Sequence, residues 1–153
     1  MNMHMQTPVE NIKIRLASLG KMVIKTKSPV DMDSGISADD LKIHYDVTVV
    51  VNRPESCVDI TVSMAYSLER LDVFSGSLTS RFDVIDLERY IVAIEGSNEF
   101  QIRNDFLPML INIAFGTTRG YLACELQDTV LSSYPFPMIS MDNIQKRTSY
   151  QLI

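Results

Sequence analysis

The fold is decided by the stretch Leu41-Lys-Ile-His-Tyr-Asp-Val-Thr-Val-Val-Val-Asn52 and its continuation Val58-Asp-Ile-Thr-Val-Ser-Met-Ala-Tyr-Ser-Leu68. In both stretches apolar side chains occupy every second position, and polar side chains fill most of the positions between them. This period of two is typical of a strand with one buried and one solvated face. The turn Asn52-Arg-Pro-Glu-Ser56 lies between the two stretches, so we predict that they form an antiparallel hairpin.

A weaker alternation occurs on both sides of this hairpin. Ile12–Leu16 alternates apolar and charged residues, Gly20 interrupts the pattern, and residues 22–24 resume it. The next segment, Lys25–Asp40, is rich in Ser, Asp, Gly and Pro, which predicts a loop. A further strand is expected over about Leu71–Ile85. Together these segments predict a four-stranded antiparallel meander with one apolar face.

The second half of the chain changes to helical spacing. Apolar residues at 87, 90, 91 and 94 predict a short helix that Gly96 ends. The main helix is expected to begin at Asn104 or Asp105 and to end at Gly116, which is placed as its C′ residue. A short last helix should follow near Asp142. Strands first and helices afterwards indicate an α+β fold, with the helices on the apolar face of the sheet.

The main helix is apolar almost all round, which predicts a second partner for it. One face can cover the sheet, while the other remains exposed in a single copy of the chain. Burying that face would contribute roughly 25 cal/mol for each Å² of apolar area. We therefore expect a homo-oligomer, a dimer or a tetramer, with Phe106, Leu110 and Ile113 between the subunits.

Length, charge and terminal sequence limit the class of protein. The 153 residues fit a single domain over 1–153. A net charge of -5 and a pI near 4.9 would repel a phosphate backbone, so nucleic acid is not an expected partner. Residues 1–8 lack the features of a signal peptide, and we expect them to form a disordered tail. The longest apolar stretch, Phe106–Phe115, is about half of a membrane span, so we expect no membrane insertion and a cytoplasmic location.

The reactive residue types form no recognisable catalytic or metal-binding motif. Cys57 and Cys124 lack metal-type spacing and suit a reducing compartment. His44 is expected on the solvated face of its strand, where acid-base chemistry would need Asp46 or Asp59 beside it in the folded chain. The acidic residues within 31–40 lack EF-hand spacing and are interpreted as a solvated loop. We therefore expect no enzyme activity, no metal and no cofactor.

One apolar segment near the C-terminus has an unusual composition. Tyr134-Pro-Phe-Pro-Met-Ile-Ser-Met141 combines aromatic residues and methionines with two prolines, so it cannot lie wholly in a helix or a ladder. Methionine adapts to varied apolar surfaces and is used by promiscuous binding proteins. Such a segment either covers a core or borders a groove for a peptide, and the residues favour neither strongly.

Four short motifs, in this order along the chain, resemble those of the SecB-type protein-export chaperones. They are the crossover Ile94-Glu-Gly-Ser97, the helix start Phe106-Leu-Pro-Met-Leu-Ile111, the turn Thr118-Arg-Gly120 and the segment Pro137-Met-Ile-Ser-Met-Asp142, which opens a last helix in that family. The resemblance covers roughly residues 10–145 and includes the meander followed by helices.

The resemblance implies a homotetramer that holds non-native polypeptides in apolar grooves without ATP. The positions that match the groove of the family are Tyr134, Phe136, Met138, Met141 and Ile94. In that family an acidic sheet face docks on the translocase motor. Here the solvated face mixes both signs of charge, which argues against the motor as a partner. An alternative is a dedicated interaction or assembly module with a SecB-like fold that is not involved in export.

Overall fold

The central hairpin forms as its alternation predicts. The computed structural model describes residues 13–27, 40–68, 71–97, 99–103 and 106–153 of the chain. In it, β3 (Leu41–Asn52) and β4 (Cys57–Leu68) pair antiparallel along their whole length, and β5 (Leu71–Val84) pairs antiparallel with β4. The predicted tail over residues 1–8 and most of the predicted loop lie outside the described residues, whereas 25–27 of that loop belong to a strand.

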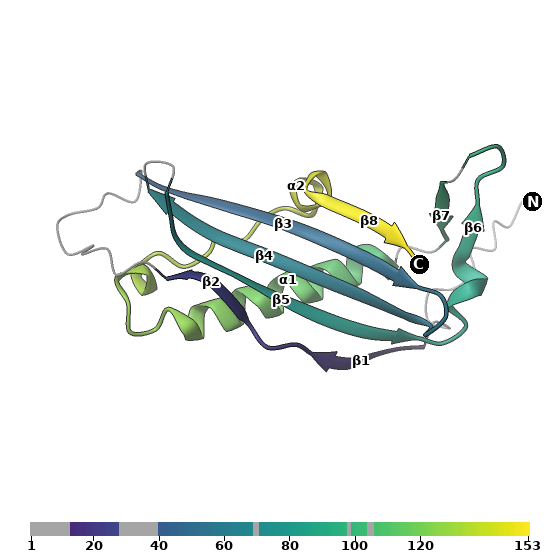
Figure 1. Cartoon of the computed structure of the whole chain (residues 1–153), viewed down its shortest axis with the longest axis horizontal. Helices are drawn as coiled ribbons and strands as arrows, with labels where there is room; N and C mark the ends of the chain where they lie inside the picture. Colours follow the sequence, from purple (N-terminus) through teal and green to yellow (C-terminus); the bar gives the residue numbers. More distant parts are fainter. Residues whose placement is uncertain (1–12, 28–39, 69–70, 98, 104–105) are drawn as a thin grey trace, which may run out of the picture.

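The prediction of a four-stranded meander is wrong, because the main sheet has six strands. The first strand is split into β1 (Ile14–Leu19) and β2 (Val23–Lys27), and both parts pair with β5 instead of β3. The chain bends between them at Gly20, whose N–H donates to the carbonyl oxygen of Thr79 at 2.8 Å. A last strand, β8 (Thr148–Leu152), pairs in parallel with β3 at the opposite edge. Figure 1 shows β8 along one edge of the sheet and β1 with β2 along the other.

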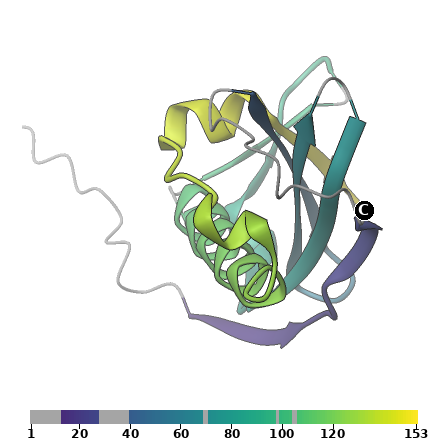
Figure 2. The same cartoon turned by 90° about the vertical axis from the view of Figure 1, so that its left-hand side faces the viewer.

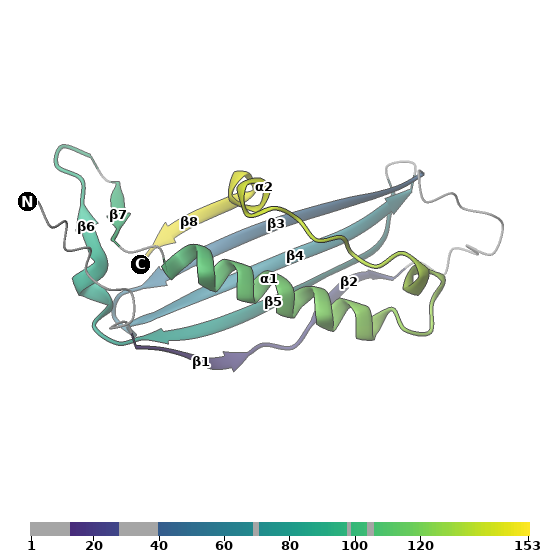
Figure 3. The ribbon, with the colours of Figure 1, turned by 180° about the vertical axis from the view of Figure 1, so that it is seen from behind.

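The long helix α1 (Phe106–Glu125) lies across one face of the sheet, as Figures 2 and 3 show. The predicted end at Gly116 and the predicted turn at Thr118–Gly120 are both wrong, because the helix continues through them. Thr118 and Leu122 extend its buried side beyond Gly116. Packing of that side against the sheet outweighs the roughly 1 kcal/mol by which a glycine disfavours a helix.

The segment between the sheet and α1 forms a hairpin instead of the predicted short helix. Only the 3-10 turn η2 (Leu87–Tyr90) is helical. β6 (Ile91–Ala93) and β7 (Phe100–Ile102) then pair antiparallel in a small sheet of their own. Gly96 lies in the turn between them with a φ of 83°, a conformation that glycine adopts without strain. This β6–β7 hairpin stands off the end of the main sheet in Figures 1 and 3.

The chain returns from α1 along the same face of the sheet. After η3 (Val130–Ser133), an irregular segment leads to α2 (Met141–Lys146), the predicted short last helix. Ser140 is its N-cap, because its hydroxyl oxygen accepts a hydrogen bond from the N–H of Asn143 at 3.3 Å. The fold is therefore α+β, with one long and one short helix on one face of a mostly antiparallel sheet. No helix among the described residues has both the length and the apolar composition that crossing a membrane requires.

Candidate polypeptide-binding surface

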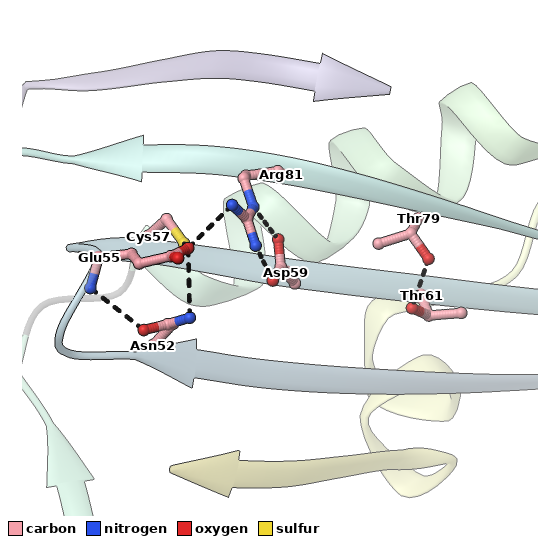
Figure 4. A network of polar contacts seen from close by, with 7 residues as sticks. All are labelled: Asn52, Glu55, Cys57, Asp59, Thr61, Thr79 and Arg81. Atoms are coloured by element: carbon pink, nitrogen blue, oxygen red, sulfur yellow. Dashed lines mark hydrogen bonds and ion pairs between the residues drawn. The ribbon is translucent and has the colours of Figure 1, made fainter. Parts of the chain in front are cut away.

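The solvated face of the sheet carries an ion-pair network centred on Arg81, shown in Figure 4. The Arg81 guanidinium donates to both carboxylate oxygens of Asp59 at 2.7 and 2.9 Å, and to Glu55 at 2.9 Å. The hydrogen bond to Asp59 raises the pKa of Arg81 above its usual range. Beside this network, burial raises the pKa of the Cys57 thiol, and the charge of Asp59 adds to the shift. Cys57 is thus disfavoured as a thiolate nucleophile.

His44 lies on the same face and lines a hollow of about 200 Å³ there together with Asp46. Its Nε2 atom is 3.0 Å from the hydroxyl oxygen of Ser67. Asp59, one of its two candidate partners, is held by Arg81. The side-chain contact of the His44 ring is thus with a hydroxyl group. Within the part of the chain that the structure describes, no three His, Cys, Asp or Glu side chains lie close enough together to hold a metal ion.

An apolar hollow of about 640 Å³ opens at the end of the molecule that carries the β6–β7 hairpin. It is bordered by β7, by the start of α1 and by β8, and its lining consists of Glu99, Phe100, Gln101, Ile102, Leu107 and Tyr150. The volume lies in the range of protein clefts that bind ligands. Tyr150 is 47% exposed, and the burial of the rest of its side chain raises its pKa. Sequence alone did not indicate this hollow, because one of its walls comes from β8, which is far along the chain from β7 and the start of α1.

The five residues predicted to bind polypeptides do not converge on this hollow. Ile94 lies in the turn of the β6–β7 hairpin and is 42% exposed. The other four belong to the segment 134–141, which runs beside α1 toward α2 (Figure 3). Within that segment Met138 is 85% exposed, whereas Tyr134 and Met141 are half-buried. Ile94 and Met138 are therefore the two predicted residues most available to a partner.

The prediction that Phe136 contacts a bound polypeptide is corrected by its burial, because only 5% of it is exposed. Its ring packs edge-on against Tyr66, Phe115 and Tyr45, with centroid distances of 5.8, 6.1 and 6.4 Å. Aromatic pairs in this geometry contribute beyond the area they bury. The reading that the segment covers the core therefore holds for Phe136, whereas Met138 faces outward.

A hydrogen bond secures the same segment to the sheet. The Tyr66 hydroxyl donates to the carbonyl oxygen of Tyr134 at 2.6 Å, and burial raises the pKa of Tyr66 to about 12. An unfolded tyrosine has a pKa near 10. The unfolded chain therefore loses this proton first as the pH rises, and stability falls between about pH 10 and about pH 12.

Tyr66→Phe tests this linkage. At about pH 8 we expect the variant to be about 1 kcal/mol less stable than the natural protein, because the hydrogen bond is lost. At about pH 12 the difference should vanish or reverse, since the natural protein alone pays about 2 to 3 kcal/mol for keeping Tyr66 neutral. Urea unfolding at the two pH values measures both differences. An equal difference in unfolding free energy at both pH values would contradict the link between ionisation of Tyr66 and stability.

The outer side of α1 carries an apolar stripe that the core does not use. Phe106 and Leu110, two of the three predicted interface residues, are buried against the sheet and cannot meet another chain. Ile113 is 44% exposed, and Met109 lies one turn before it on the same side. Gly116 continues the stripe, and a Cβ atom built there would meet nothing within 4 Å. Met109, Ile113 and Gly116 are spaced four and three residues apart, which places them on one side of the helix. Phe106 and Leu110 belong to the side that packs on the sheet.

Comparison of the chain with protein-family models, with curated proteins and with solved structures finds no match. The function of the surface must therefore be inferred from its residues and their geometry.

Proposed function

We propose that this protein is an ATP-independent chaperone that holds non-native polypeptides in the apolar hollow, with the exposed side chains of Ile94 and Met138 as further contacts elsewhere on the molecule. The observation that carries the proposal is the open hollow of about 640 Å³ with Phe100, Ile102 and Leu107 in its lining. Unfolded chains expose apolar side chains of many shapes, and burying them releases free energy without requiring a particular sequence.

The residues around the hollow suit such a ligand. Among the described residues that line the hollow, Glu99 carries the charge, so apolar or basic segments should bind better than acidic ones. Met138 has a flexible, polarizable side chain that adapts to varied partners. The resemblance of the motifs at 94–97, 106–111 and 137–142 to those of SecB-type chaperones supports the same function. Because the solvated face of the sheet pairs Arg81 with Asp59 and Arg15 with Asp83, we do not extend the proposal to docking on a translocase motor.

The proposal is tested by suppression of client aggregation. At near-stoichiometric ratios, we expect the natural protein to keep a chemically unfolded client from scattering light. Ile102→Glu should lose most of this activity, because it places a carboxylate in the apolar hollow, and Ile94→Ser should lose part of it. Val23→Glu is the matched control, since Val23 is 54% exposed on the opposite edge of the sheet.

Thermal unfolding of each variant shows whether it is folded before its activity is compared. Equal activity of Ile102→Glu, Ile94→Ser and Val23→Glu would overturn the proposal, as would a natural protein without activity. Capture of a single stoichiometric folded partner in place of diverse clients would favour the dedicated interaction module.

We further propose that two or more copies associate through the stripe on α1 formed by Met109, Ile113 and Gly116. The two exposed apolar side chains, with a glycine that lets another backbone approach closely, suit the packing of one helix against another. The hollow is lined by Leu107 of the first turn of α1 together with residues of β7 and β8, whereas the stripe begins at Met109 and continues along α1 to Gly116.

A further inference from the structure

The strand β8 leaves one of its edges without a partner among the described residues. It pairs with β3 on one side only and ends the order of the main sheet. The carbonyl oxygen of Arg147 accepts from the N–H of Val47 at 3.1 Å, and the N–H of Ile153 donates to Val51 at 3.0 Å. Main-chain groups alternate in direction along a strand, so the odd-numbered residues of this stretch face β3. Thr148, Tyr150 and Leu152 therefore present their N–H and C=O groups to the open edge.

The open edge and the apolar hollow adjoin each other at Tyr150. Tyr150 is paired with Val49, and its side chain lies on the same face of the sheet as that buried valine. This side chain forms part of the lining of the hollow, together with Phe100 and Ile102 of β7. A strand laid along the open edge would thus have main-chain partners on β8 and apolar side chains beside it.

Resting on the proposed function, we infer that an extended apolar segment of a non-native polypeptide binds by adding a strand to the open edge of β8 and placing a side chain in the hollow. Main-chain hydrogen bonds give affinity that does not depend on sequence, and the hollow selects apolar side chains at alternate positions. The structure itself shows that this end of the sheet accepts a parallel strand, since β8 is held to β3 in that way. The mode of binding explains how one site can take many clients.

The size of the edge favours a short segment over a second folded copy. The five residues of β8 offer an edge about 17 Å long. A stable contact between folded proteins buries about 1,200 Å² or more, which an edge of this length cannot supply alone. The acidic side chain of Glu99 adds a preference for a neutral or basic segment.

Two substitutions at one position separate the main chain from the side chain. Tyr150→Ala and Tyr150→Pro both remove the phenol ring, but only proline also removes the outward N–H. That N–H is not used by β3, and proline is tolerated on an edge strand where its missing N–H would face solvent. The probe is a fluorescent ten-residue peptide of alternating valine and serine with one lysine, and its binding is followed by fluorescence anisotropy.

We expect Tyr150→Ala to weaken binding about threefold to tenfold and Tyr150→Pro to weaken it at least a further tenfold. The natural protein should bind the same peptide at least tenfold more weakly when its four central residues are N-methylated, since N-methylation removes donors and retains apolar surface. This second comparison needs no variant and stands even where Tyr150→Pro disturbs β8.

Equal binding of the plain and N-methylated peptides would overturn strand addition, as would a natural protein that binds neither. If that protein still suppresses client aggregation, the chaperone function stands and only its mode of binding is wrong. Loss of both activities would overturn the two proposals together.

Discussion

Replacing Phe136 by alanine is expected to lower the free energy of unfolding by about 3 to 5 kcal/mol. The ring is almost fully buried and contacts Tyr45, Tyr66 and Phe115 edge-on. Its removal deletes three aromatic contacts and leaves a cavity beside an existing hollow of about 160 Å³ that Tyr66 and Leu122 help to line. Urea unfolding followed by circular dichroism measures the loss.

Met138→Ala is the matched control, because Met138 lies two residues further along the same segment and is 85% exposed. We expect it to change stability by less than about 0.5 kcal/mol. Its effect should instead be on client holding. A loss below about 1 kcal/mol for Phe136→Ala would show that the segment is not fastened to the core through this ring.

Ile113→Glu is expected to convert the proposed oligomer to single chains. Ile113 lies at the centre of the exposed stripe on α1, and a carboxylate there would have to be buried without a partner in any helix-to-helix contact. Two such charges facing each other should weaken association by at least a hundredfold, or about 2.7 kcal/mol. Light scattering coupled to size-exclusion chromatography measures the mass of each form.

Ile94→Glu makes the same substitution at an isoleucine of similar exposure, which lies in the turn of the β6–β7 hairpin and not on α1. This control should keep the mass of the natural protein. A natural protein that is already a single chain in solution would contradict the proposed association, and the stripe would then need another explanation.

The parts of the fold that follow from local pattern were predictable. β3 and β4 are joined by a short turn, and their alternation decides both their faces and their register. The C-terminal helix was placed correctly because Ser140 caps it and Ile144 anchors it to the core. In these cases the residues that determine the structure are neighbours in the sequence.

The neighbours of the edge strands were not predictable in the same way. Alternation tells which face of β1 is apolar, but it does not tell whether β3 or β5 lies beside it. β8 has one half-buried large apolar residue, Leu152, and it pairs with a strand roughly a hundred positions earlier in the chain. The hollow was not predictable for the same reason, because Tyr150 of β8 forms one of its walls.

Within the C-terminal segment 134–141, the sequence alone could not tell which large apolar residue is buried in the core and which is exposed. Phe136 and Met138 are both large and apolar and lie two positions apart, so a residue scale ranks them alike. Phe136 is buried and Met138 is exposed because Tyr45, Tyr66 and Phe115 surround the position of a single ring, which Phe136 occupies. The same reasoning applies to α1, where burial of Leu110 and exposure of Ile113 depend on which side faces the sheet.

Site-specific photo-crosslinking to an unfolded client tests the central claim most directly. A photoreactive amino acid is placed in turn at positions 94, 138 and 23, and each protein is irradiated with the client during its dilution from denaturant. We predict strong cross-links from 94 and 138, where Ile94 and Met138 are exposed, and little from 23 on the β1–β2 edge of the sheet. Cross-links of equal strength from all three positions, or from 23 alone, would contradict the holding of clients by these side chains.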